Sequence, residues 1–309
     1  MRVLFMGTAA FACPTLNRLL ASSHELIAVV TQPDRPRGRG RQAAMSAVKI
    51  WALEHRVSVL QPATLRGAEV VETLATWQPD VMVVVAYGNI LPPAVLELPP
   101  YGCINLHASL LPKYRGPAPV NWALIHGETH TGYTIIHMDA QVDTGPILWS
   151  EPCPIEPDDD AISLGTRLSE SGAAGLIDVL TGLAHGTLTP QLQPTIGSSS
   201  APKLTRDLGR IDWQQSATTL HHLIRGLVPW PGTTTHFGAT EVKIRRATVR
   251  TTPHAEAPGT VTAITSEGVL VACGIDQLLV QEVHPANRRR MPARDFVQGY
   301  HVQQGNRFA

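Results

Sequence analysis

The sequence is short of the features that mark disulfide-rich, zinc-binding or membrane proteins. Its 309 residues include four cysteines, scattered without CxxC or Cys/His spacing, which favours reduced structural thiols. No run of eighteen apolar residues is present, and the chain opens directly into a predicted strand without a signal or transit peptide. We therefore expect a cytoplasmic protein, and favour the bacterial cytoplasm over an organelle.

An overall excess of charge is also absent, but the two parts of the chain differ in sign. Residues 1–199 hold 12 Lys and Arg against 17 Asp and Glu, a net charge of −5. Residues 200–309 hold 13 against 8, a net charge of +5. This asymmetry indicates that an anionic partner reaches the C-terminal region.

The first part of the chain alternates between predicted strands and helices. Residues 2–6, 26–30 and 81–86 are apolar strand-like runs, and helical patterns cover residues 11–22, 45–55 and 68–76. This alternation predicts an α/β fold with a Rossmann-like, mostly parallel sheet and helices on both faces. No GxGxxG motif follows the first strand, so an NAD site has little support.

A change in composition predicts two domains. Residues 190–208 are rich in Pro, Ser, Thr and Gly, which indicates a linker between domains at residues 1–189 and 209–309. The second domain contains five short strand patterns separated by turns, followed by a helical pattern near its end. Such a series predicts a small β barrel.

Polar side chains gather around a predicted strand at residues 103–106. Asn105 and His107 are two residues apart, so they point to one side of the strand near its C-terminal end. Open α/β sheets bind their ligands at that end. A second predicted strand, residues 132–139, leads into a tight turn that holds Asp143. We expect the amide, the imidazole and the carboxylate to converge there.

These three groups suit the attack of a neutral amine on an acyl carbon. The amide and the protonated imidazole would donate to the developing oxyanion, while the carboxylate would fix the charge state of the imidazole and help remove the amine's proton. Neither a covalent nucleophile nor a metal ion is needed. Asn105, His107 and Asp143 are therefore the predicted catalytic residues.

Four short motifs in this region carry a resemblance to a known family: Asn105-Leu-His107, Ser109-Leu-Leu-Pro112, Arg115-Gly116 and Asp143-Thr-Gly145. In this order they resemble the signature of the folate-dependent formyltransferases. The chain as a whole, as far as the Trp230-Pro-Gly232 region, resembles the members of that family that act on methionyl-tRNA. The resemblance implies formyl transfer from 10-formyltetrahydrofolate to the α-amine of initiator methionyl-tRNA. It also implies an OB-like C-terminal barrel, a fold that commonly binds nucleic acids and is expected here to bind tRNA. We expect a monomer, because one substrate-sized groove needs only one copy of the chain.

The resemblance places folate at the ligand end of the sheet. A pterin ring needs apolar walls and backbone hydrogen bonds. Two loops are expected to supply them, the one that follows His107 and the one that follows the strand at residues 81–86. The implied folate-binding residues are Ser109, Leu110, Leu111, Pro112, Val85, Tyr87, Gly88 and Ile90.

Basic residues in two regions are the predicted tRNA contacts. Arginines at positions 35, 37, 39 and 41 alternate with Pro and Gly in a segment that cannot pack a core. It is either a solvated loop or an arm that binds a phosphate backbone, and the resemblance favours the arm. The implied tRNA contacts are Arg35, Arg37, Arg39, Arg41, Lys203, Lys243, Arg245 and Arg246, with Arg288, Arg289 and Arg290 on the same path.

Two positions depart from the family pattern. Ala9 follows Gly7-Thr8 where relatives usually have proline, and Gln141-Val142 precede Asp143 where many relatives have Gly-Leu or Gly-Val. The second departure leaves open how the Asp143 turn is held. Three other functions also remain open: formyl transfer to a small amine, folate-linked RNA binding without turnover, and folate hydrolysis by the same three residues.

Overall fold

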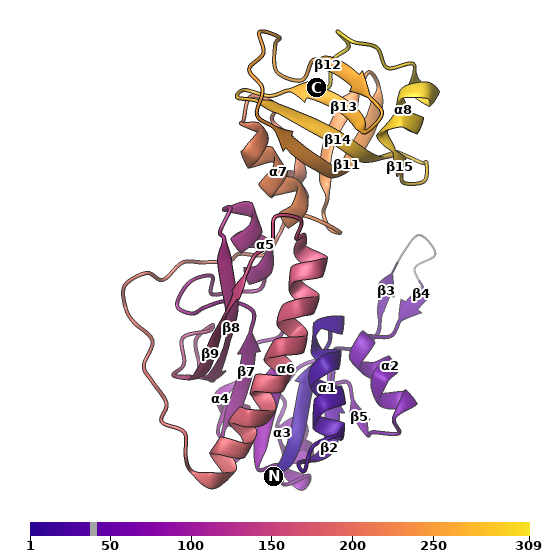
Figure 1. Cartoon of the computed structure of the whole chain (residues 1–309). Helices are drawn as coiled ribbons and strands as arrows, with labels where there is room; N and C mark the ends of the chain where they lie inside the picture. Colours follow the sequence, from indigo (N-terminus) through magenta and orange to yellow (C-terminus); the bar gives the residue numbers. More distant parts are fainter. Residues whose placement is uncertain (38–41) are drawn as a thin grey trace. The chain divides into compact units, whose positions relative to one another are not determined.

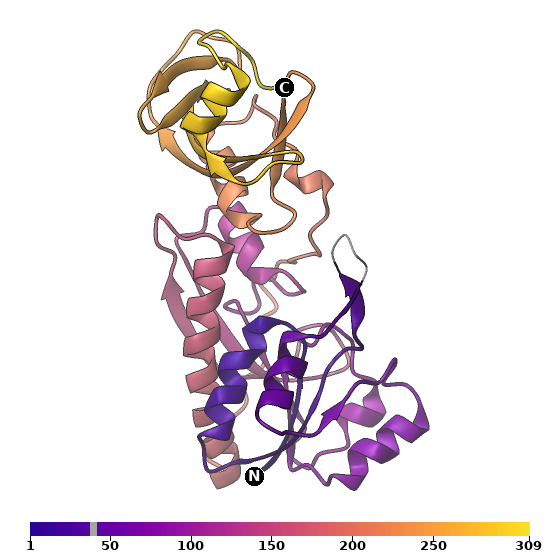
Figure 2. The same cartoon turned by 90° about the vertical axis from the view of Figure 1, so that its right-hand side faces the viewer.

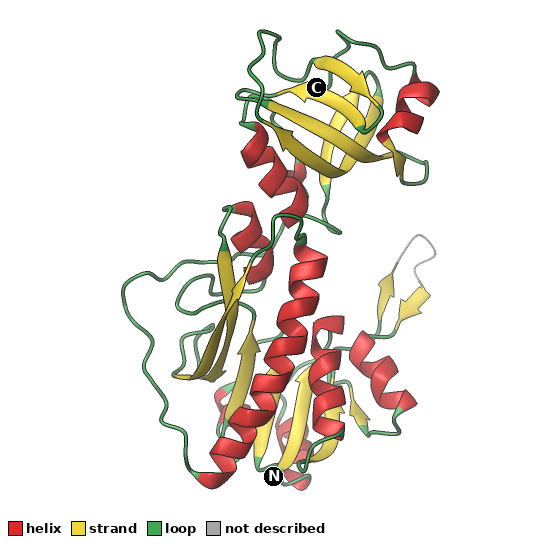
Figure 3. Ribbon diagram, viewed as in Figure 1, coloured by secondary structure: helices red, strands yellow, loops and turns green. Residues whose placement is uncertain are grey.

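The computed structural model of the chain describes residues 1–37 and 42–309, which form two compact units. Figure 1 and Figure 3 show the elements of both. The first unit comprises Met1–Pro119, His130–Pro154 and Gly165–Pro202, and the second comprises Val120–Thr129, Ile155–Leu164 and Lys203–Ala309. Two short segments inside the predicted first domain therefore pack with the second unit. No helix among the described residues is long and apolar enough to cross a membrane.

A seven-stranded sheet forms the centre of the first unit, with the strand order β5-β2-β1-β6-β7-β8-β9. Its first five strands in this order pair in parallel, and β8 pairs antiparallel with both β7 and β9. This confirms the predicted mostly parallel sheet. The strands are β1 (Arg2–Gly7), β2 (Glu25–Val30), β5 (Val59–Leu60), β6 (Val81–Val85), β7 (Cys103–His107), β8 (His130–His137) and β9 (Ile147–Pro154).

Helices cover both faces of this sheet, because its strands are apolar on both sides. In β1, Val3 and Phe5 face one core, while Leu4 and Met6 face the other. Residues of α1 (Cys13–Leu20), α2 (Ala47–Glu54) and α6 (Ala161–His185) complete the first core. Those of α3 (Ala68–Thr76) and α4 (Pro93–Leu96) complete the second. Figure 2 shows α1 beside α6, as does Figure 1.

A separate hairpin lies between β2 and α2. Its strands, β3 (Arg35–Arg37) and β4 (Gln42–Ala44), are antiparallel. Asp34 anchors the base, since its carboxylate accepts hydrogen bonds from Lys49 Nζ at 2.6 Å and Gln61 Nε2 at 2.8 Å. These two donors lower the pKa of Asp34, which keeps it ionised. The predicted basic arm thus starts as an ordered antiparallel pair.

The second unit is built on an antiparallel sheet with the order β10-β11-β14-β13-β12, to which β15 adds on β14. One apolar core joins this sheet to α7 and α8. The pattern agrees with the small barrel predicted from the sequence. The elements are α5 (Pro119–Ile125), α7 (Ala217–Gly226), β10 (Thr233–Phe237), β11 (Thr240–Arg250), β12 (Val261–Thr265), β13 (Gly268–Ala272), β14 (Gln277–Pro285), β15 (Met291–Pro292) and α8 (Ala293–Tyr300).

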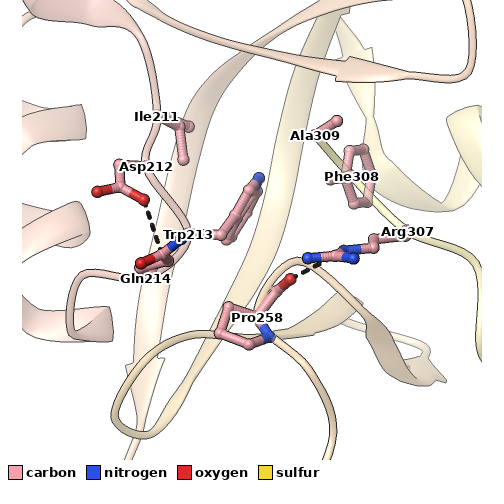
Figure 4. Close-up of a pocket in the computed structure, with 8 residues that line it drawn as sticks. All are labelled: Ile211, Asp212, Trp213, Gln214, Pro258, Arg307, Phe308 and Ala309. Carbon is pink, nitrogen blue, oxygen red and sulfur yellow. Dashed lines mark hydrogen bonds between the residues drawn. The ribbon is translucent and has the colours of Figure 1, made fainter.

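The last residues of the chain connect the two ends of this sheet. Ala309 exchanges two 2.9 Å backbone hydrogen bonds with His236 of β10, and Phe308 donates to the carbonyl of Gly259 beside β12. Trp213 supports the closure from inside, because its indole donates to Thr235 Oγ1. A hollow of about 690 Å³ lies next to it, and Figure 4 shows the residues that line it. Its lining comprises Ile211, Asp212, Trp213, Gln214, Pro258, Arg307, Phe308 and Ala309.

Candidate active site

The register of β7 brings Asn105 and His107 to the ligand end of the sheet. Ile104 and Leu106 face the core that contains α6. The alternate residues therefore face the opposite side, where Cys103 packs in the other core. His107 is buried, and Asn105 is half-buried. The two polar side chains thus continue the face of β7 that is apolar at Cys103.

The Asp143 turn joins β8 to β9 and is held by its own polar groups. Asp139 accepts hydrogen bonds from the Gln141 N–H at 2.9 Å and the Thr144 hydroxyl at 2.7 Å. Asp143 has a φ of 54°, in the left-handed region that asparagine and aspartate adopt more readily than most residues. Gly145 lies so close to the His137 carbonyl that a Cβ there would overlap it. These contacts explain the Asp-Thr-Gly sequence and show how the turn forms with Gln141.

Three groups converge on the Asp143 carboxylate, two of them as hydrogen-bond donors. Asn105 Nδ2 donates to Oδ1 at 3.3 Å, and the Gly116 N–H donates to Oδ2 at 2.8 Å. His107 Nδ1 lies 3.5 Å from Oδ2, with side-chain exposures of 6% for His107 and 14% for Asp143. The predicted convergence of amide, imidazole and carboxylate is therefore observed. Because the group is nearly buried, these interactions act with little screening by water.

The loop after β7 supplies the remaining partner of the histidine. His107 Nε2 lies 2.9 Å from the Tyr114 carbonyl, an acceptor, so Nε2 carries a hydrogen. Tyr114 has a φ of 63°, which turns this carbonyl back toward the ring. The Ser109 hydroxyl closes the loop by donating to the Lys113 carbonyl at 2.6 Å. Thr134 of β8 ties it to the sheet, since its hydroxyl donates to the Ser109 carbonyl.

The predicted linker does not run free, because residues 191–201 lie across both halves of the site; we call this segment the strap. Gln191 and Ile147 exchange backbone hydrogen bonds of 2.8 and 2.7 Å. The Gln193 amide donates to the carbonyls of Asp143 at 2.9 Å and Gly145 at 2.8 Å. Further along, the Ala201 N–H donates to the Arg115 carbonyl at 2.6 Å.

Gln193 and Tyr114 were missed by sequence reasoning. Tyr114 acts through its backbone carbonyl, which every residue possesses, so its side chain gives no signal. For Gln193 the only hint is the alternation of polar, apolar and polar residues at 191–193, which is typical of an extended strand. The turn-forming composition of the surrounding segment hides it.

Cys103, two residues before Asn105 on β7, is unsuited to covalent chemistry. Burial raises the pKa of Cys103 to about 12, so the thiol is protonated at neutral pH. Among the described residues, no group of three or more His, Cys, Asp or Glu side chains is placed to hold a metal ion. Asn105, His107 and Asp143 bring an amide, an imidazole and a carboxylate within hydrogen-bonding or ion-pair distance of one another.

The predicted folate-binding residues fall into two classes. Val85 and Tyr87 pack in the two cores at 0% and 2% exposure, so only their backbone groups are available. Ser109 and Leu111 are likewise buried in their loop. The exposed or half-buried members are Gly88, Ile90, Leu110 and Pro112, and Ile90 is the clearest candidate for an apolar wall at 72% exposure. Their contact with folate stays a prediction.

The predicted tRNA contacts also differ in their surroundings. Arg35, Lys203 and Arg246 are exposed. Lys243 Nζ donates to the Pro231 carbonyl at 2.9 Å, and Arg245 Nη1 donates to the Pro229 carbonyl at 3.1 Å. Arg290 forms an ion pair with Glu282, and Arg288 and Arg289 are exposed. Arg39 and Arg41 lie outside the described residues, as does the side chain of Arg37.

Two family profiles match the chain. The profile described as formyl transferase covers residues 1–180, and the one described as formyl transferase, C-terminal domain, covers residues 203–301. The first contains all three converging residues, and the second contains the antiparallel sheet. Fold and site together thus define the class, a formyltransferase with two modules.

Named relatives specify the class further. The methionyl-tRNA formyltransferase of Trichlorobacter lovleyi is 46% identical over 98% of this chain and 96% of its own length. That of Geobacter sulfurreducens is 44% identical over 99% and 96%. The chain belongs to the methionyl-tRNA formyltransferase family.

Solved structures share the fold at low identity. HypX from Aquifex aeolicus, in complex with tetrahydrofolic acid, is 17% identical with a TM-score of 0.65, over 97% of this chain and 47% of that one. The N-formyltransferase from Helicobacter canadensis is 16% identical with a TM-score of 0.66, over 90% and 98%. Proteins with different names therefore share this fold. The molecule that accepts the formyl group has to be inferred from other features.

Proposed function

We propose that the chain transfers the formyl group of 10-formyltetrahydrofolate to the α-amine of methionyl-initiator tRNA, which gives N-formylmethionyl-tRNA for translation initiation. The observation that carries the proposal is the contact of Asn105 and His107 with one carboxylate, that of Asp143, at 3.3 and 3.5 Å. Near full-length similarity to methionyl-tRNA formyltransferases supports the choice of acceptor.

Each of the three groups has a chemical task in this reaction. One N–H of the Asn105 amide is directed at Asp143, which leaves the second for the oxygen of the formyl group as negative charge develops on it. His107 donates from Nε2 once that oxygen replaces the Tyr114 carbonyl as its acceptor. Asp143 holds the imidazole and takes the amine's proton, directly or through one water.

The reaction balances without an intermediate on the protein. A bond forms between the amine nitrogen and the formyl carbon, and the bond between that carbon and the folate nitrogen breaks. The proton that the amine loses passes by way of Asp143 to the folate nitrogen. Tetrahydrofolate leaves, and the site returns to its starting charge.

The fit to folate and tRNA rests on exposed groups. The loop after β6 presents the apolar side chain of Ile90 close in sequence to Gly88, which has no side chain and a φ of 81°, where a pterin needs a wall and a close approach. Arg35, Lys203 and Arg246 present exposed cations for phosphates. One copy of the chain suffices, because Asn105, His107 and Asp143 belong to one unit. We place the reaction in the bacterial cytoplasm, where initiator tRNA is charged and used.

Labelled donor and charged tRNA test the proposal. The protein is incubated with formyl-labelled 10-formyltetrahydrofolate and either initiator or elongator methionyl-tRNA. Label is expected in the initiator only. Transfer to small amines instead of tRNA, loss of formyl without any acceptor, or folate binding without turnover would each replace it with one of the three other functions.

A further inference from the structure

Gln193 links the two halves of the active site from a segment outside the motifs. Its Nε2 donates to the carbonyls of Asp143 at 2.9 Å and Gly145 at 2.8 Å. Both acceptors belong to the turn that presents the carboxylate. A single side chain thus fixes two peptide groups of that turn, on either side of Thr144.

Arg115 fixes the orientation of this amide. Its Nε and Nη2 donate to Gln193 Oε1 at 3.2 and 2.6 Å. Because the amide oxygen of Gln193 faces a guanidinium, its NH₂ group must face the two carbonyls. In the flipped orientation the amide oxygen would face these carbonyl oxygens, and the NH₂ group would face the guanidinium. Arg115 lies in the loop that supplies the Tyr114 carbonyl and the Gly116 N–H. Gln193 therefore connects that loop with the Asp143 turn.

The turn needs external support because of its backbone. Asp143 at φ 54° and Tyr114 at φ 63° occupy a region that persists only where surrounding contacts hold it. If the backbone at Asp143 changed conformation, its carboxylate would lose its contacts with Asn105, Gly116 and His107 at the same time. The strap repeats this support in its second half, where the Ser199 hydroxyl accepts from the Tyr114 N–H at 2.9 Å.

We infer that Gln193 is a positioning residue for formyl transfer, which acts by holding Asp143 in register with Asn105 and His107. The inference rests on the proposed function of the same site. It predicts a loss in kcat, because substrates bind to other groups, whereas an error of about 1 Å in the placement of a catalytic group costs on the order of 100-fold.

The test uses the full chain and the variant Gln193→Met, which keeps the length of the side chain and removes its hydrogen bonds. We expect kcat to fall about 10- to 100-fold, with KM for folate and for tRNA within about twofold. Gln191→Met is the matched control, since the Gln191 side chain is exposed on the same strap. It should keep the kcat of the unaltered protein.

A double-mutant cycle separates positioning from a general loss of structure. In the Asp143→Asn background, Gln193→Met should cost less than about twofold more, because the group that it positions is already gone. A full additional loss in that background, or a kcat of Gln193→Met within twofold of the unaltered protein, would overturn the inference.

Hydrogen exchange gives a readout that does not depend on activity. Amides of residues 112–118 and 139–147 should exchange faster in Gln193→Met than in the unaltered protein, and unchanged in Gln191→Met. Equal exchange in all three proteins would show that Gln193 does not hold the turn. If the unaltered protein forms no formylmethionyl-tRNA, the proposed function fails, and exchange alone still decides the role of Gln193.

Discussion

Asp143 in the first unit and Arg246 in the second are both charged groups predicted to act on a substrate, but their surroundings differ. The Asp143 side chain is 14% exposed, accepts two hydrogen bonds and lies 3.5 Å from His107 Nδ1. Arg246 is exposed on β11, next to Arg245, whose guanidinium donates to the Pro229 carbonyl. The catalytic group is fixed from several sides, while the basic strand mixes exposed cations with tethered ones.

This contrast indicates where a single substitution has a large effect. A buried group that orders several partners acts as a unit with them, so its loss disturbs the whole site. Exposed cations act on phosphates one at a time, and their contributions add in small steps. Substitutions of both kinds, in descending order of their consequences, test this contrast.

Asp143→Asn should have the largest effect. Asparagine keeps the shape of the side chain and accepts the left-handed backbone at this position, so the turn is expected to stay folded. It removes the proton acceptor and the negative charge that faces His107. We expect kcat to fall about 10²- to 10⁴-fold in single-turnover transfer of labelled formyl.

Asp139→Asn is the control for this substitution. It changes a carboxylate of the same turn that is exposed and holds Thr144 and the Gln141 N–H. Its kcat should stay within about threefold of the unaltered protein, because Asp139 contacts none of the converging groups. Equal losses for both variants would mean that the turn, rather than the Asp143 carboxylate, determines the rate.

Gly116→Ala should destabilise the first unit. Gly116 has a φ of +120°, and a Cβ there would lie 2.7 Å from the Ala201 carbonyl oxygen of the strap. We expect the free energy of unfolding of this unit to fall by about 1–3 kcal/mol, together with a lower kcat. Gly165→Ala, in α6 with no atom within 4 Å of the added Cβ, should cause no loss of stability. Denaturant unfolding with a probe in the first unit measures both.

Arg246→Ala and Arg245→Ala compare an exposed cation with its tethered neighbour. Arg246→Ala should weaken tRNA binding several-fold and make the dependence of log Kd on log salt shallower by about one. Arg245→Ala should instead lower the Tm of the second unit, because it releases the Pro229 carbonyl and exposes the surface under its stem. Filter binding over a salt series, with thermal unfolding, distinguishes them. A greater loss of affinity for Arg245→Ala would reverse the assignment.

His221→Gln should have the smallest effect, seen only at acid pH. Burial lowers the pKa of His221 to about 4, and the nearby Arg225 and His222 act in the same direction, against Asp158. Below an unfolded pKa of about 6.5 the unfolded chain binds a proton that the folded chain refuses, so stability is lost as pH falls toward 4. Between pH 7 and 5 the Tm of the second unit should fall less in His221→Gln than in the unaltered protein. His236→Gln, at an exposed position of β10, should follow the unaltered protein.

Much of the fold and the central part of the site could be predicted because they follow from local pattern. The alternation of side chains along β7 and the position of the strand end place Asn105 and His107 without knowledge of distant contacts. The apolar run at residues 81–85 gave the central strand, but it could not tell that the Val85 side chain lies in a core and Ile90 outside. Residues that line a pocket and residues that pack in a core are equally apolar, so the sequence pattern does not distinguish them.

The parts that sequence did not show depend on contacts between distant segments. Arg115 and Gln193 are 78 positions apart, and their link ends on backbone carbonyls that carry no sequence signal. The sequence suggests one basic cluster made of Lys243, Arg245 and Arg246. Register shifts on either side of Arg246 set it apart from the two cations that hold the Pro229 and Pro231 carbonyls. Such a bulge is visible only once the strand has a partner.

The strap also determines how this chain can be divided. A fragment cut at residue 180, where the first family profile ends, would keep Asn105, His107 and Asp143 but lose Gln193, Ser199 and Ala201. Dissection into separately produced modules should therefore keep the chain through Pro202, the boundary that its contacts give. The composition between Gln193 and Ser199 is typical of a loop that tolerates insertions and deletions. Because both residues are hydrogen-bonded to the first unit, a change of length between them would alter the distance that the strap has to span.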